Sequence, residues 1–179
     1  MDAIALLKQD HRAVEKLFKQ FEKTTQPAQQ RKLARKVIEQ LSVHAAIEEM
    51  VFYPAVRDRV PKEEETVLEA LEEHHVVKWV LSELEDMKPD HERFTAKMAV
   101  LMESVRHHVK EEESELFPEV RKGIKRKELA ELGAALEKAK KTAPTSPHPR
   151  APDTPPGNLV AGPTAAVVDK VKKKVGGKK

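Results

Sequence analysis

The sequence has no cysteine, few aromatic residues and no long apolar run. The absence of cysteine from all 179 positions excludes disulfide bonds, thiolate metal ligands and cysteine nucleophiles. Aromatic residues make up 4% of the chain and charged residues 35%, which disfavours the strands of a sandwich or barrel and suits helices. No apolar run approaches the roughly 20 residues that span a bilayer, and the N-terminus lacks a signal-peptide pattern. We therefore expect a cytoplasmic protein with no stable membrane association.

Proline and glycine are concentrated after residue 141. Residues 142–179 hold seven of the 12 prolines and four of the six glycines, and no aromatic residue. Such a segment buries too little apolar surface to offset its ordering entropy, so we predict a disordered tail. The tail carries a net charge of +5, which leaves −2 for residues 1–141 although the whole chain carries +3. We therefore expect no nucleic-acid partner for the folded core, and only weak contacts of the basic tail with anions.

Five segments before residue 142 have apolar positions at helical spacing, punctuated by prolines. The predicted helices are Ala3–Lys23, Ala28–Tyr53, Glu63–Met87, Glu92–Phe117 and Lys125–Lys140. Because the first four are long, amphipathic and joined by short connections, they predict an all-α fold, an antiparallel up-down four-helix bundle with a short fifth helix. We divide the chain into the bundle (1–122), the fifth helix (123–141) and the tail (142–179).

One motif occurs twice, 64 residues apart. His44–Pro54 and His108–Pro118 share the pattern H-x-x-x-E-E-x-x-[FL]-[YF]-P. A weaker match relates Asp10-His11 to Glu73-His74 on the two other long helices. Each half of the bundle is therefore predicted to be a helical hairpin with a histidine on its first helix and a histidine–glutamate pair on its second.

The repeated polar residues lie on the apolar faces of their helices. His44 and Glu48 follow Leu41 by three and seven positions, and the same test selects His74 over His75. A buried carboxylate must be paired, hydrogen-bonded or bound to a metal. The predicted metal ligands are His11, His44, Glu48, His74, His108 and Glu112.

Nitrogen and oxygen donors without thiolate favour iron, with manganese or zinc as less favoured alternatives. If each carboxylate bridges two ions that an oxo or hydroxo group also joins, each ion keeps an open position. Glu49 and Glu113 adjoin the bridging residues and are predicted to orient ligand imidazoles. Glu15 is interpreted as a boundary charge or a partner of a ligand, and Tyr53, displaced from helical geometry by Pro54, as an apolar plug. The sequence leaves open whether Glu15 or Tyr53 enters the metal shell.

This combination of motifs resembles the hemerythrin-like, HHE cation-binding domain family, over about residues 1–122. The resemblance implies a four-helix bundle around a non-haem di-iron centre. It implies that the four histidines are terminal ligands and that Glu48 and Glu112 bridge. It also implies oxygen binding, reaction with peroxide or nitric oxide, or sensing of oxygen and iron.

Two positions differ from the oxygen-carrying hemerythrins. One turn after His74 the chain has Lys78 instead of a second histidine, and five residues after His108 it has Glu113 instead of an aspartate. At the second position Glu112 is better aimed than Glu113. The loss of the histidine leaves coordination more open, which favours reaction with a small oxidant (O2, H2O2 or NO), including catalase- or peroxidase-like activity, over reversible oxygen carriage. The alternative is a non-enzymatic iron, oxygen or redox sensor whose metal state controls the tail or a partner.

Overall fold

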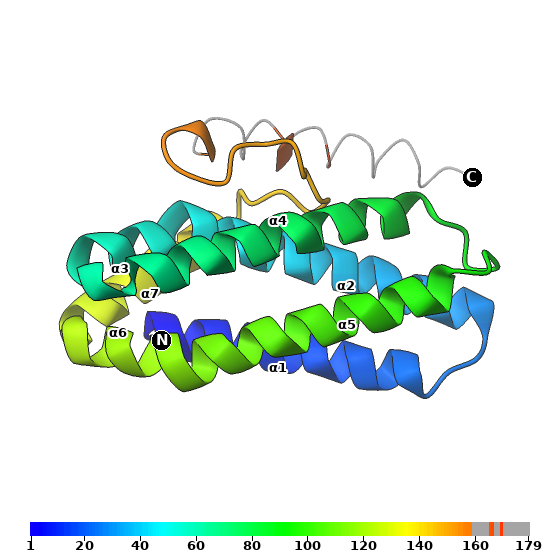
Figure 1. Ribbon diagram of the computed structural model, residues 1–179, viewed down its shortest axis with the longest axis horizontal. Coiled ribbons are helices and arrows are strands. Elements are labelled where there is room, and N and C mark those ends of the chain that lie inside the picture. Colours follow the sequence, from blue (N-terminus) through cyan, green and yellow to red (C-terminus); the bar gives the residue numbers. More distant parts are fainter. Residues whose placement is uncertain (159–164, 167–168, 170–179) are drawn as a thin grey trace.

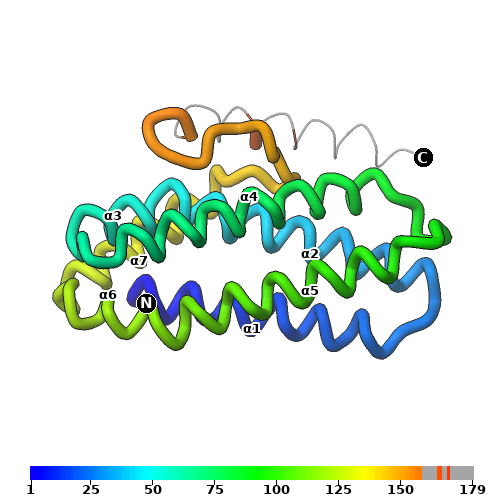
Figure 2. The backbone as a smooth tube through the Cα atoms, in the orientation of Figure 1, coloured from blue at the N-terminus to red at the C-terminus, as the bar shows by residue number. Residues whose placement is uncertain are grey.

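The computed structural model describes residues 1–158, 165, 166 and 169, and this part of the chain contains helices and no strands (Figure 1). Successive long helices run antiparallel and lie side by side (Figure 2). The four long helices are α1 (Ala3–Glu22), α2 (Pro27–Ile47), α4 (Glu64–Asp86) and α5 (Phe94–Glu111). The predicted all-α, up-down four-helix bundle is therefore confirmed.

The second and fourth long helices do not end at their prolines. Each widens into a π-helical turn and then resumes as a short α-helix. These elements are η1 (Glu48–Phe52) before α3 (Tyr53–Arg59), and η3 (Glu112–Leu116) before α6 (Phe117–Gly123). The short 3₁₀ turn η2 (Pro61–Glu63) then leads from α3 into α4.

The π turns explain how a helix continues through Pro54. A proline donates no N–H, and its ring clashes with the carbonyl four residues earlier, which a wider turn relieves. The Tyr53 N–H accordingly bonds to the Glu48 carbonyl five residues back. Tyr53 has φ −61° and ψ −42°, so our prediction that Pro54 displaces it from helical geometry is wrong.

The predicted fifth helix is α7 (Arg126–Lys140), which packs against α1 and η1. Gly133 of α7 faces the start of the chain. A Cβ atom there would lie 2.3 Å from the Met1 carbonyl oxygen and 2.9 Å from the Ala3 nitrogen. The absence of a side chain therefore lets α7 approach the N-terminal backbone closely.

The apolar core consists of two clusters. One fills the end of the bundle near α3, α6 and α7 and contains Phe52 and Phe117. The other fills the end near the α4–α5 connection and contains Phe18 and Phe94. The buried polar residues of the bundle lie between these clusters, so apolar packing holds them from both ends.

The beginning of the predicted tail lies along α2 and α4 (Figure 1). Ser146 Oγ donates to Glu85 Oε1 at 2.7 Å, and the Arg150 guanidinium lies 5.6 Å from the Trp79 ring centroid. The predicted disorder falls partly on residues 159–164, 167–168 and 170–179, which lie outside the described residues. Within the described residues, no helix is long and apolar enough to cross a membrane.

Candidate metal centre

The fold brings the six predicted metal ligands together in the middle of the bundle. Each long helix supplies one histidine, and each π turn supplies one glutamate as its first residue. All six are at most 6% exposed. Their donor atoms form two neighbouring groups that share Glu48 and whose geometry could hold metal ions. The groups are His11, His44, Glu48 and Glu112, and Glu48, His74 and His108.

The histidines face each other in two pairs. The Nε2 atoms of His11 and His44 lie 3.1 Å apart, and those of His74 and His108 lie 3.2 Å apart. Two nitrogens bound to one ion at about 2.1 Å and at right angles to each other would be about 3 Å apart. Each pair therefore has the spacing of adjacent ligands on a single ion.

The two carboxylates lie between the histidine pairs. Glu48 Oε2 is 3.2 Å from His44 Nε2 and 3.5 Å from His74 Nε2. Glu112 Oε2 is 3.4 Å from His11 Nε2 and 3.7 Å from His108 Nε2. Each carboxylate thus contacts one histidine of each pair, the position that a bridging ligand requires.

The buried carboxylates are electrostatically incomplete. Both oxygens of Glu48 and Oε2 of Glu112 have no hydrogen-bond partner among the described residues. Burial, and next the nearby charge of Glu112, raise the pKa of Glu48 well above its usual value. Since an unpaired buried carboxylate is costly and a cation would compensate it, the residues present fit a metal centre.

The outer nitrogens of two histidines are held across the bundle by the residues that follow the inner glutamates. His74 Nδ1 lies 3.1 Å from Glu49 Oε1, and His11 Nδ1 lies 2.9 Å from Glu113 Oε1. This is the orienting arrangement that the sequence predicts for these glutamates. Glu113 thus faces the outer side of His11, whereas the inner carboxylate comes from Glu112.

The outer nitrogens of the other two histidines face acids that the sequence analysis did not assign. His108 Nδ1 is hydrogen-bonded to Glu73 Oε2 at 2.7 Å, whereas His44 Nδ1 lies 3.5 Å from Asp10 Oδ2, beyond a hydrogen bond. Lys140 of α7 contacts the other oxygen of Asp10 at 2.6 Å. The sequence pattern that could have indicated these two acids is their position directly before a predicted ligand, in Asp10-His11 and Glu73-His74.

Burial favours the neutral imidazole form that binds metals. It lowers the pKa of His44 to about 4, although the Asp10 carboxylate acts in the opposite direction. Burial also lowers the pKa of His74, against the opposing contact with Glu49. Both rings are therefore neutral, and able to coordinate, at neutral pH.

Tyr53 reaches the site from the end of η1. Its hydroxyl donates to Glu112 Oε1 at 2.9 Å and lies 3.4 Å from His74 Nε2. The ring is 1% exposed, as expected of a plug, but the polar contacts make that interpretation incomplete. Glu15 instead contacts Arg106 at the surface, with Oε2 2.9 Å from Nε, and acts as the boundary charge that was one of its two interpretations.

Lys78 stands where the oxygen-carrying hemerythrins have a second histidine on the third long helix. Its side chain does not take the place of that metal ligand. Its Nζ lies 2.8 Å from Glu49 Oε1, on the outer side of His74. A small cavity of about 30 Å³ adjoins the four histidines and is otherwise lined by apolar side chains. A cavity needs about 10–15 Å³ to hold one water molecule, so this one has room for about two. The apolar residues lining it are Val14, Leu41, Ala45, Val77, Val105 and Val109.

Comparison with known proteins agrees with this geometry. The family model of the hemerythrin HHE cation-binding domain matches residues 2–120. A hemerythrin HHE cation-binding domain-containing protein from Mycobacterium kansasii has a similar fold, with a TM-score of 0.65 and 23% identity, over 79% of this chain and 88% of that one.

Two curated relatives are similar in sequence. An uncharacterised hemerythrin-like protein of Schizosaccharomyces pombe is 34% identical over 134 residues, which cover 74% of this chain and 66% of that protein. A protein named DNA nickase, from Nostoc sp., is 26% identical over 135 residues, which cover 75% of this chain and 38% of that protein. The chain thus spans slightly less than two thirds of one relative and well under half of the other.

Proposed function

Since the chain belongs to the hemerythrin HHE cation-binding family, we propose that its buried site holds two iron ions and reacts with a small oxidant such as O2, H2O2 or NO. The observation that carries the proposal is that both oxygens of Glu48 and Oε2 of Glu112, buried between two histidine pairs, have no hydrogen-bond partner among the described residues. Buried carboxylates in this state are expected to be retained for a cation rather than for the stability of the empty bundle.

The proposed ligands divide evenly between the ions. His11 and His44 would hold one ion, His74 and His108 the other, and Glu48 and Glu112 would bridge them together with an oxo or hydroxo group. Imidazole and carboxylate donors favour iron over manganese and zinc in this arrangement. Iron bound there would supply redox chemistry toward the oxidant.

The surrounding residues would control access, water and protons. The apolar walls of the 30 Å³ cavity limit what can lie beside the histidines to molecules of very few atoms. The Tyr53 hydroxyl holds a proton 2.9 Å from Glu112, and burial raises the pKa of Tyr53 well above its usual value, which keeps that proton in place. A small apolar cavity together with a proton held beside Glu112 supports consumption of peroxide, in the manner of a catalase or peroxidase.

Metal analysis followed by a peroxide assay tests the proposal. Protein expressed with sufficient iron should contain two irons per chain, and peroxide loss should disappear in His108→Ala. His107→Ala is the matched control, because His107 adjoins His108 but its side chain is 63% exposed. Absence of iron, manganese and zinc from the purified protein would refute the metal centre.

A sensor is the second candidate, supported by a contact between the tail and the site. Asn158 Nδ2 donates to the Glu49 carbonyl oxygen at 2.9 Å, and Glu49 holds His74. A change at the metals could therefore alter how the tail is held. Redox-dependent cleavage of residues 142–179 by protease, without peroxide turnover, would favour the sensor over the enzyme.

The charge of this chain gives no support for a DNA-directed activity like the one in the name of the Nostoc relative. The net charge of −2 over residues 1–141 provides no basic footprint for DNA on the folded core. The cytoplasmic location expected from the sequence remains a prediction, as do the oxidant and the partners of the tail.

A further inference from the structure

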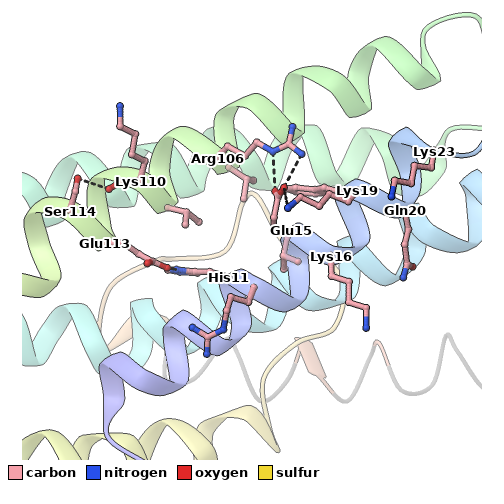
Figure 3. Close-up of a pocket in the computed structure, with 15 residues that line it drawn as sticks. His11, Glu15, Lys16, Lys19, Gln20, Lys23, Arg106, Lys110, Glu113 and Ser114 are labelled. Carbon is pink, nitrogen blue, oxygen red and sulfur yellow. Dashed lines mark hydrogen bonds and ion pairs between the residues drawn. The ribbon is translucent and has the colours of Figure 1, made fainter.

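A large groove runs along the surface between α1 and α5 (Figure 3). Its volume is about 940 Å³, and its apolar lining comes from Val14, Phe18, Val105 and Val109. His11, one of the proposed metal ligands, also lines this groove. The groove therefore extends from solvent to the outer side of the metal centre.

The groove and the small inner cavity have a common wall. His11, Val14, Val105 and Val109 line both spaces. Val14 and Val105 are 4% and 6% exposed, so they belong to the packed interior and still border the groove. The wall is consequently one side chain thick, with the groove on one side and the inner cavity on the other.

Ion pairs at the surface cross the groove between α1 and α5. Arg106 of α5 contacts Glu15 at 2.9 Å and Glu22 at 2.8 Å, as Figure 3 shows for Glu15. Glu113 contacts Lys8 at 3.1 Å. Solvent-exposed ion pairs of this kind contribute little to stability, so they hold α1 and α5 together less firmly than apolar packing would. On the opposite side of the bundle, the described part of the tail contacts α4 and η1.

We infer that the groove between α1 and α5 is the access route of the oxidant and that Val105 and Val109 determine which oxidants pass. This inference rests on the proposed function. It names the substrate class as oxidants of two or three heavy atoms, because the inner cavity is about 30 Å³ and the valine wall closes it. Hydroperoxides with a bulky organic group can enter the groove but are stopped at the wall.

The absence of cysteine permits a test that needs no metal. Val105→Cys and Val77→Cys each create a single thiol at a buried position that lines the inner cavity. Only Val105 borders the groove, although Val77 is slightly more exposed, at 9% against 6%. In folded, metal-free protein, methyl methanethiosulfonate should modify Val105→Cys at least about tenfold faster than Val77→Cys. Equal rates, or a faster reaction at Val77→Cys, would overturn the proposed route.

A second pair of variants tests selectivity in the iron-loaded protein. Val109→Ala and Val77→Ala both enlarge the inner cavity, but only Val109→Ala thins the common wall. The rate with tert-butyl hydroperoxide, relative to H2O2, should rise at least about fivefold in Val109→Ala and stay unchanged in Val77→Ala. Equal rates with both peroxides in the unmodified protein, or an equal rise in both variants, would refute the selectivity. If the iron-loaded protein consumes neither peroxide, the proposed peroxide activity fails, and the thiol reactions alone decide the route.

Discussion

Lys78 Nζ lies 2.8 Å from Glu49 Oε1, and both side chains are at least 90% buried. The same carboxylate oxygen is 3.1 Å from His74 Nδ1. The charge of Lys78 thus compensates a carboxylate whose contact orients one of the proposed metal ligands. The residue that stands in the place of a second histidine therefore acts on the site through Glu49.

Loss of the Lys78 charge should destabilise the metal-free bundle. In Lys78→Met the Glu49 carboxylate stays buried without its cation, which should lower the free energy of unfolding by about 3 kcal/mol. Urea denaturation measures the change. The double variant with Glu49→Gln should recover most of the loss, because it removes the uncompensated charge. A loss below about 0.5 kcal/mol in Lys78→Met would show that the ion pair is not a significant stabilising contact.

Removal of the two inner carboxylates should affect the metal-free and metal-loaded proteins in opposite directions. Glu48→Gln combined with Glu112→Gln should stabilise the metal-free protein by about 1–4 kcal/mol, because relief from the burial that raises the pKa of Glu48 outweighs the loss of the histidine contacts that lower the pKa of Glu112. The same variant should lose most of its bound metal and the stability that metal binding confers. Thermal unfolding with and without chelator, together with metal analysis, gives both effects.

Glu115→Gln is the control for that variant, because Glu115 lies in the same π turn as Glu112 but is exposed. It should change neither metal content nor stability. A metal content of two per chain in the double variant would contradict the bridging roles.

Gly133→Ala should destabilise the protein although alanine is the better helix former. In an open helix position this substitution gains about 1 kcal/mol. Here the new Cβ would meet the Met1 carbonyl oxygen at 2.3 Å, so α7 must move away from the N-terminus, at a cost of about 1–3 kcal/mol. Denaturant unfolding measures the sign. Ala134→Gly, at the adjacent exposed position, should lose about 1 kcal/mol through helix propensity alone.

The sequence was sufficient to predict the bundle and to bring the six inner residues together. Apolar spacing of 3.6 residues fixes which side of a helix faces inward, so His44 and Glu48 could be placed without knowledge of the neighbouring helices. The choice of His74 over His75 rested on the same argument, and His74 is the one that lies 3.2 Å from His108.

Other features depend on distances between helices and could not be read from one helix at a time. Asp10 supports His44 on the next helix, and Glu73 supports His108, although each acid precedes a different predicted ligand in the sequence. The π turn at Glu48 was missed because a proline after an apolar run reads as a helix end. Structurally, that wider turn carries the helix through Pro54 and places Tyr53 beside Glu112.

Acid should destabilise the metal-free protein through His44. Its pKa is about 4 in the folded protein, against an ordinary value of 6.5, so the unfolded chain binds this proton first as the pH falls. The contribution of His44 to stability is therefore complete above pH 6.5 and is lost between pH 6.5 and about 4, a loss of about 3 kcal/mol. Urea denaturation of the metal-free protein at about pH 7, 5.5 and 4.5 should show a smaller decrease in His44→Gln than in the unmodified protein. Equal pH dependence in the two proteins would mean that folding leaves the pKa of His44 unchanged, which conflicts with a buried imidazole that is held in its neutral form.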